Sequence, residues 1–146
     1  MTPRKIVVMG LGYVGLPTAA VFASRRINVL GVDVNEHAVN TINSGNIHIV
    51  EPSLDIVVRA AVTEGYLKAA LKPEQADAFM IAVPTPFKGD KVPDMAYVEA
   101  ATRSIAPLLE KGNLVVLVST SPVGTSEQIS AWLAQERPDL TFPHTA

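Results

Sequence analysis

The sequence predicts one α/β domain, built on a parallel sheet that helices cover on both faces. Its 146 residues are about the length of a single domain. With 48% hydrophobic and only 18% charged residues, the chain can bury a sizeable core. Short β-branched runs alternate along the chain with helical patterns, and this alternation is typical of a parallel sheet between helical layers.

The first half of the chain has the order strand, turn, helix, strand. Residues 4–9 and 28–33 are β-branched runs that predict buried strands. An alanine-rich stretch between them predicts a helix, with Pro17 in its first turn, where the missing N–H is not needed. Shorter elements should follow: a helix over 36–43, a helix over 53–64 that ends at Gly65, and a strand over 67–71.

The second half continues the alternation. Residues 77–83 and 114–119 are apolar runs that predict two further strands. Between them Asp94 can cap a helix whose apolar residues recur at spacings of three and four, and Pro107 should distort its last turn. A final helix is expected over 126–135.

A glycine-rich turn follows the first strand and opens the first helix. It has the form G-x-G-x-x-G and consists of Gly10-Leu11-Gly12-Tyr13-Val14-Gly15. In this motif Gly10 permits the tight turn, Gly12 lets a diphosphate approach the backbone, and Gly15 allows close packing of helix and strand. The helix N-terminus then offers unpaired N–H groups to the diphosphate. The alternative is that the glycines serve a tight turn alone.

Asp33 closes the second strand, eighteen residues beyond Gly15. This is near the spacing at which dinucleotide-binding folds carry the acid that accepts hydrogen bonds from the adenosine ribose. Its charge should repel the additional phosphate of NADP, so we expect the cofactor to be NAD. The alternative for Asp33 is an ordinary helix cap or turn residue. Together, the turn and the acid predict a Rossmann-type doubly wound sheet.

Two later strands end in loops that could complete the site. Val83, Pro84, Thr85 and Pro86 follow the fourth strand, and a hydroxyl-rich loop over 119–126 follows the fifth. Because open α/β sheets bind ligands at the carboxyl ends of their strands, we expect both loops to lie beside the dinucleotide. Prolines and hydroxyls also occur in any turn between a strand and a helix, which is the alternative.

Three motifs together resemble the UDP-sugar 6-dehydrogenases, which oxidise the primary alcohol of a nucleotide sugar to a carboxylate with two NAD molecules. They stand in the family's order and spacing, and the resemblance covers essentially the whole chain: the glycine turn, Val83-Pro84-Thr85-Pro86, and Ser119-Thr120-Ser121-Pro122-Val123-Gly124. Within the family, segments 46–52, 82–90 and 93–97 resemble most the branch that acts on UDP-N-acetyl-D-mannosamine in enterobacterial common antigen synthesis.

This resemblance implies roles for particular residues. It implies NAD contacts at Tyr13, Val14, Asp33, Thr85 and Ser126. It also implies that Thr120 lies near the reacting centre, where the family uses a threonine to order a water. Two positions depart from the pattern: Ser126 replaces a threonine, and Val118 stands where the mannosamine branch has an acidic residue.

The family's catalytic thiol has no counterpart in this sequence. In the family a cysteine captures the aldehyde intermediate and carries it to a thioester, and this chain has no cysteine. The family's lysine and asparagine partners, sugar-binding domain and dimerisation helix correspond to sequence beyond residue 146. We therefore expect residues 1–146 to be an NAD-binding domain that lacks its last strand and binds NAD without turnover. The UDP-sugar substrate would be the partner of the full-length enzyme, and the open sheet edge favours a homodimer.

Composition excludes several other partners. Twelve Lys and Arg against fourteen Asp and Glu give a net charge of −2, and the basic residues are scattered, so we expect no nucleic-acid partner. Glycines and Pro17 interrupt the apolar run after Lys5, so we expect no secretory signal, no membrane span and a cytoplasmic protein. The three histidines lack the spacing of metal ligands, so we expect no metal site: His37, His48 and His144.

Two other classes of NAD-binding protein share parts of this pattern. Short-chain epimerases and dehydratases need a Tyr-x-x-x-Lys pair, but the residues four positions after the three tyrosines are Pro17, Ala70 and Ala101. A non-catalytic NAD-sensing regulatory module shares the glycine turn and the strand-end acid and stays open as an alternative function. Such a module has no need of the hydroxyl-rich loop facing a nicotinamide.

Overall fold

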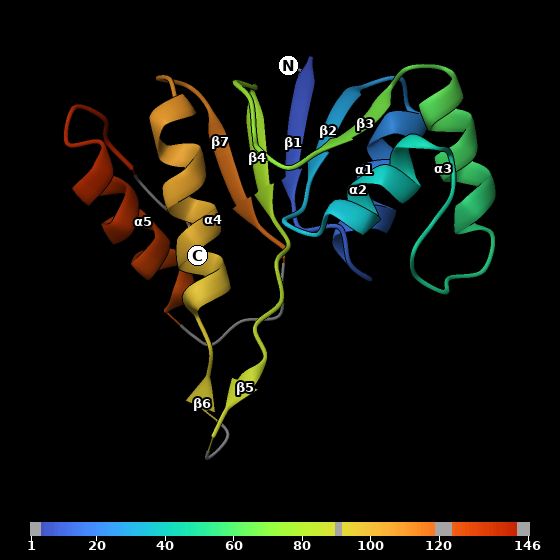
Figure 1. Ribbon diagram of the computed structural model, residues 1–146. Coiled ribbons are helices and arrows are strands. Elements are labelled where there is room, and N and C mark those ends of the chain that lie inside the picture. The colour runs from blue at the N-terminus through green and yellow to red at the C-terminus, as the bar shows by residue number, and fades with distance from the viewer. Residues whose placement is uncertain (1–3, 90–91, 119–123, 143–146) are drawn as a thin grey trace.

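Five parallel strands form one sheet in the order β3-β2-β1-β4-β7 (Figure 1). The computed structural model describes residues 4–89, 92–118 and 124–142. In chain order the strands are β1 (Lys5–Met9), β2 (Asn28–Val32), β3 (Leu67–Ala70), β4 (Ala78–Ile81) and β7 (Leu114–Leu117). The chain first adds strands on one side of β1 and then crosses to the other side, so the strand order reverses between β1 and β4. This arrangement confirms the predicted doubly wound α/β fold.

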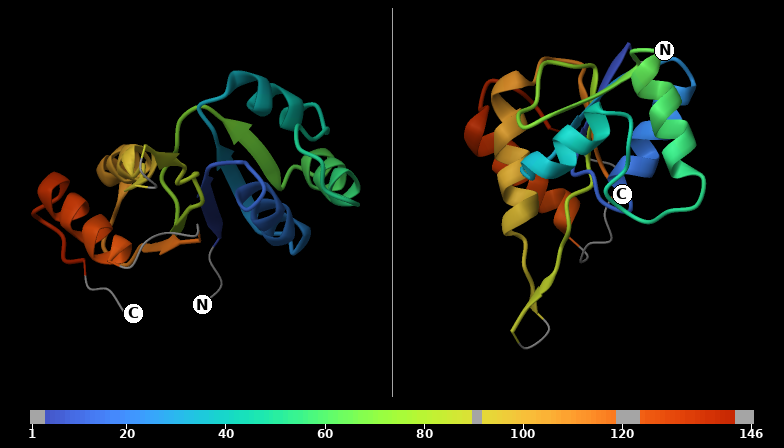
Figure 2. Two further views of the ribbon diagram at one scale, coloured as in Figure 1. Left: turned by 90° about the horizontal axis from the view of Figure 1, so that it is seen from below. Right: turned by 45° about the vertical axis from the view of Figure 1, so that its right-hand side comes forward.

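Helices cover both faces of the sheet (Figure 2). The helices are α1 (Gly15–Ser24), α2 (Glu36–Asn43), α3 (Leu54–Thr63), α4 (Ala96–Ile105) and α5 (Thr125–Glu136). Helices α1 and α3 pack together on one face, α4 and α5 on the other, and α2 lies against the edge strand β3. The connections from β1 to β2, from β2 to β3 and from β4 to β7 each carry at least one helix, whereas β3 is joined to β4 by a loop without a helix.

Because side chains alternate between the two faces of the sheet, the strands contribute to two hydrophobic cores. In β1, Ile6 and Val8 point into the core under α1 and α3, whereas Val7 and Met9 point into the core under α4 and α5. All four side chains are buried, as a sheet covered on both faces requires. Trp132 of α5 lies in the second core, where its side chain is 8% exposed.

Several boundaries differ from those expected by a residue or two. Strands β2 and β4 end at Val32 and Ile81, before the expected ends at Asp33 and Val83, and β7 ends at Leu117, while its expected end at Ser119 lies outside the described residues. Asp94 does not cap α4 in the usual position: its Oδ1 accepts a hydrogen bond from Ala96 N at 3.0 Å, and the helix begins at Ala96. The expected distortion at Pro107 takes the form of a 3-10 turn over Ala106–Leu108.

A small antiparallel hairpin was not expected from the sequence. It consists of β5 (Phe87–Lys88) and β6 (Val92–Pro93) and projects beyond the carboxyl edge of the main sheet (Figure 1). Two-residue strands, one of which contains a proline, carry too little alternation to be recognised in a sequence.

Candidate functional site

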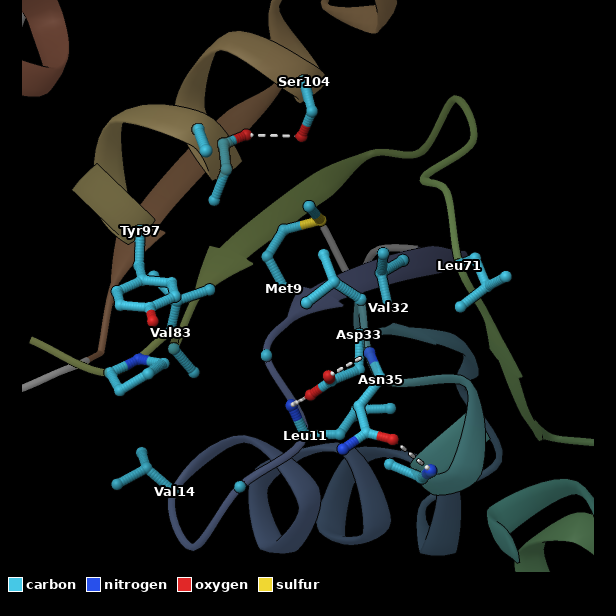
Figure 3. A pocket seen from close by; sticks show the side chains of 18 of the residues that line it. Met9, Leu11, Val14, Val32, Asp33, Asn35, Leu71, Val83, Tyr97 and Ser104 are labelled. Atoms are coloured by element: carbon cyan, nitrogen blue, oxygen red, sulfur yellow. Dashed lines mark hydrogen bonds between the residues drawn. The ribbon is translucent and has the colours of Figure 1, made fainter. Parts of the chain in front are cut away.

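A cavity of about 810 Å³ lies at the carboxyl edge of the sheet, where the strand order reverses (Figure 3). This is the place where open α/β sheets bind ligands, and the volume lies in the range of small-molecule sites. The ends of β1, β2 and β4 supply its floor. Its walls come from the loops after these strands and after β3, from the loop between α2 and α3, and from α2 and α4: Gly10 to Val14, Asp33 to Asn35, Ala38, His48, Leu71 to Pro73, Ala82 to Thr85, Tyr97, Ala100, Ala101 and Ser104.

The three motif glycines have three different environments. Gly10 has a φ of +99°, and a Cβ there would lie 2.8 Å from Ala82 O. A Cβ on Gly15 would lie 1.7 Å from Gly10 O, so only glycine lets α1 begin this close to the turn. By contrast, a Cβ on Gly12 would meet nothing within 4 Å. Gly12 therefore faces open space, while the other two are required by the packing of the protein itself.

The first turn of α1 presents unpaired donors to the cavity. The first helical N–H with a partner is that of Leu16, which donates to Gly12 O at 3.1 Å. Within the described part of the chain, the N–H groups of Tyr13 and Val14 donate no hydrogen bond, and no side chain caps the helix. These groups and the positive end of the helix dipole together form a site suited to an anion.

Asp33 joins the glycine turn to the start of α2 (Figure 3). One carboxylate oxygen accepts a hydrogen bond from Leu11 N at 3.0 Å, and the other accepts one from Asn35 N at 2.9 Å. Asn35 Oδ1 in turn accepts from Ala38 N at 3.2 Å and caps α2. Each carboxylate oxygen can accept a further hydrogen bond, so this held carboxylate can still receive two hydroxyl donors from a ligand.

The opposite wall comes from the loop after β4 and from α4. Val83, Pro84 and Thr85 follow β4 and line the cavity, and Tyr97 of α4 lines it as well (Figure 3). The Tyr97 side chain is 47% exposed, so this part of the cavity is open to solvent. The wall offers apolar and aromatic surface, which suits a planar ring more than a charged group.

The structure brings together most residues of the predicted site. Nine of them line the cavity: Gly10, Leu11, Gly12, Tyr13, Val14, Asp33, Val83, Pro84 and Thr85. Gly15 is buried beneath the turn and does not line it. Ser126 lies exposed in the first turn of α5, away from the cavity lining. Thr120 lies outside the described residues.

Sequence reasoning missed several residues that line the cavity. His48 comes from the loop between α2 and α3, residues 71–73 follow β3, and Tyr97 and Ser104 come from α4. The carboxyl end of β3 could have indicated residues 71–73, since it lies at the same edge of the sheet. No local pattern marks His48, because the loop that carries it reaches the cavity only through the packing of α2 and α3.

The cavity holds few charges. Asp33 and Lys72 are the charged side chains among its described lining residues. Elsewhere, the Lys5 ammonium holds the pKa of Glu74 below its usual value through a side-chain hydrogen bond, at the opposite edge of the sheet, where β1 begins.

Among the described residues no cluster of His, Asp and Glu could hold a metal ion. Nor is any helix of that part of the chain long and apolar enough to cross a membrane.

Comparison with known proteins gives a consistent result. An NDP-N-acetyl-D-galactosaminuronic acid dehydrogenase from Ralstonia nicotianae is 66% identical over 97% of this chain, which covers 33% of that protein. A UDP-N-acetyl-D-mannosamine dehydrogenase from Yersinia pestis is 66% identical over 100% of this chain and 35% of its own length. The chain thus spans about a third of the length of these relatives.

A solved structure shares the same architecture. That of a UDP-D-ManNAc dehydrogenase from Pyrococcus horikoshii superposes with a TM-score of 0.89 at 38% identity, covering 94% of this chain and 33% of that one. Residues 4–145 match the NAD binding domain of the UDP-glucose/GDP-mannose dehydrogenase family. With the glycine turn, the strand-end acid and the cavity between them, this match shows that the chain belongs to the UDP-glucose/GDP-mannose dehydrogenase family, as its NAD-binding domain.

Proposed function

We propose that the cavity holds one NAD molecule with its adenosine ribose at Asp33 and its diphosphate at the first turn of α1. The observation that carries this placement is Gly12, whose missing Cβ leaves open space directly beside the unpaired N–H groups of Tyr13 and Val14. The nicotinamide end then points toward Val83, Pro84 and Thr85.

Each part of the proposed site has one task. The N–H groups at the start of α1 stabilise the charge of the diphosphate without a basic side chain. Asp33 selects the ribose hydroxyls and disfavours the phosphate that NADP carries in their place. The wall at Val83 and Tyr97 offers the nicotinamide ring an apolar and aromatic surface. When bound, NAD supplies a two-electron acceptor for hydride.

The proposed substrate is a UDP-N-acetylhexosamine, oxidised at its primary alcohol to the uronate. UDP-N-acetyl-D-mannosamine is the sugar favoured by the sequence motifs, while relatives named for a mannosamine and for a galactosaminuronic acid match equally well. The overall change consumes one water and two NAD, because alcohol to carboxylate is a four-electron oxidation. In this proposal Thr120 orders the attacking water.

The 146 residues bind NAD but do not turn over the sugar, because they contain no thiol to capture the aldehyde. Calorimetric titration should show one NAD bound per chain and much weaker binding of NADP. Incubation with UDP-N-acetyl-D-mannosamine and NAD should produce no absorbance at the wavelength of NADH. Absence of NAD binding would overturn the cofactor proposal, and NADH formation would overturn the proposed lack of turnover.

A further inference from the structure

His48 lies in the loop between α2 and α3 and lines the cavity. Its neighbours Ile47 and Ile49 both pack against the core under α1 and α3. These two anchors fix the loop on the side of the cavity formed by α1 and α2. Tyr97 and Ser104 come from α4, which packs on the other face of the sheet. His48 is therefore on the same side as Asp33 and the glycine turn.

The imidazole of His48 lacks the partners that a buried histidine normally has. Its Nδ1 is shut off from solvent and has no hydrogen-bond partner in the described part of the chain. It is the only buried side-chain nitrogen or oxygen of the described residues in this condition. Buried polar atoms without partners are rare and costly, so each one in a native protein calls for an explanation. No hydrogen bond within the described residues explains why this position carries a histidine.

The isolation of Nδ1 determines what the other ring nitrogen can do. A neutral imidazole carries one N–H, and a buried N–H without an acceptor is rarer than a buried acceptor without a donor. The proton is therefore better placed on Nε2. Since only Nδ1 is both buried and unpartnered, Nε2 is the nitrogen that a molecule in the cavity can reach. His48 then presents an N–H donor to the cavity.

We propose that His48 is a cofactor-binding residue whose Nε2–H donates a hydrogen bond to an oxygen of the ADP half of NAD. This rests on the proposed NAD site, in which Asp33 and the α1 N-terminus hold that half. Both a diphosphate oxygen and a ribose hydroxyl oxygen offer the required acceptor. The nicotinamide half lies toward α4 and receives nothing from His48.

The test compares three variants of the 146-residue chain by titration with NAD. His48→Leu removes the donor and should weaken NAD binding about tenfold, the loss typical of one hydrogen bond to a charged or strongly polar group. His48→Gln places an amide N–H near the position of Nε2 and should recover most of the affinity. His37→Leu is the matched control, because His37 is an exposed histidine of α2 that does not line the cavity, and it should bind NAD as the unmodified chain does.

Fragments of the cofactor locate the acceptor. His48→Leu should weaken the binding of ADP and leave that of nicotinamide mononucleotide unchanged. If adenosine binding falls as much as ADP binding, the acceptor is a ribose hydroxyl; if only ADP binding falls, it is the diphosphate. Loss confined to nicotinamide mononucleotide would overturn the proposal.

A measurement on the unmodified chain tests the role of His48 even if a variant does not fold. On saturation with ADP the ¹⁵N resonance of His48 Nε2 should move, while that of His37 should not. An unmoved His48 resonance, or NAD binding by His48→Leu equal to that of the unmodified chain, would overturn the proposed role of His48 and leave the proposed NAD site standing. If the unmodified chain bound neither NAD nor ADP, the proposed function would fail together with it.

Discussion

Gly12 and Gly15 stand three residues apart in one motif, and their substitution should separate binding from folding. Gly12→Ala adds a methyl group into open space, so the free energy of unfolding should change by less than about 1 kcal/mol. The same methyl group would occupy the room of the diphosphate and weaken NAD binding at least about tenfold.

Gly15→Ala should have the opposite effect. Its methyl group would overlap the carbonyl of Gly10, so the free energy of unfolding should fall by about 3 kcal/mol or more. Chemical denaturation and calorimetric titration of both variants measure the two effects. Equal loss of stability in the two variants would contradict the different environments of these glycines.

In the proposed site, Asp33 selects NAD over NADP. Asp33→Asn removes the negative charge, and its amide cannot accept hydrogen bonds from both Leu11 N and Asn35 N. We expect NAD affinity to fall and the preference for NAD over NADP to shrink by at least about tenfold, which is about 1.4 kcal/mol.

Glu36→Gln is the control for this change. It removes a neighbouring negative charge from the first turn of α2, outside the cavity lining. Titrations with both dinucleotides should give it the preference of the unmodified chain. An Asp33→Asn variant that kept the full preference for NAD would show that the carboxylate does not select the cofactor.

At the residue scale, the sequence predicted the members of the glycine turn and the strand-end acid because their chemistry is local. The tight turn, the close helix start and the acid each depend on a few neighbouring positions. His48 and Tyr97 reach the cavity through the packing of distant elements, so no local pattern marks them. Asp33 showed a further role only in the structure, where it also holds the glycine turn against α2.

Among the elements, α2 is held to the edge strand β3 by one side chain. Asn43 Oδ1 accepts a hydrogen bond from Ala69 N at 2.8 Å, and its Nδ2 donates to Ala69 O at 2.9 Å. The amide thus satisfies the edge strand as a further strand would. Asn43→Ala should lower the free energy of unfolding by about 2 kcal/mol, since two hydrogen bonds are lost at a partly buried site.

Asn40→Ala controls for the change in helix propensity. Asn40 lies in the same helix, is exposed, and makes no side-chain hydrogen bond within the described residues. Urea denaturation should show that this variant is as stable as the unmodified chain or slightly more stable. If both asparagine variants lost the same free energy of unfolding, the two hydrogen bonds from Asn43 to β3 would contribute nothing to stability.

Strand β7 is the other edge of the sheet and should make the chain self-associate. Leu114 N and Val118 N donate to the β4 side, so the N–H groups of Val115 and Leu117 point to the open side. Leu114 is also 58% exposed. Unpaired edges of this kind favour association between copies.

Light scattering should therefore show an average mass that rises with protein concentration. Leu114→Lys places a charge on the edge and should shift this curve toward the monomer, without loss of stability because the side chain is already exposed. A mass that stays monomeric over the whole concentration range would contradict this expectation.

The order of the main elements could be predicted because each buried strand is a continuous β-branched run bounded by turn residues. Strand ends were less well predicted, since the residues that leave the sheet at Asp33 and Val83 remain compatible with a strand. The hairpin β5–β6 could not be predicted, because its short strands pair only with each other. Residues 82–86, which form no helix, strand or turn, carry the chain from the end of β4 to this hairpin beyond the carboxyl edge.

At the scale of the whole molecule, the location of the candidate site follows from the point between β1 and β4 where the strand order reverses. The chain builds β1, β2 and β3 outward on one side and then crosses to β4 and β7, which leaves a cavity between the loops of the two halves. In the proposed site, the first half supplies the diphosphate and ribose contacts, and the second supplies the wall for the nicotinamide. A ligand that spans both halves should also stabilise the fold by mass action.

Amide chemical shifts recorded during a titration of the 146-residue chain with NAD test this account most directly. We expect the amides of residues 10–14, 33–35 and 83–85 to shift together along one binding curve, because one molecule contacts all three loops. No shift at saturating NAD, or shifts confined to the outer face of α3 around Arg59, would contradict the placement of NAD at the carboxyl edge of the sheet.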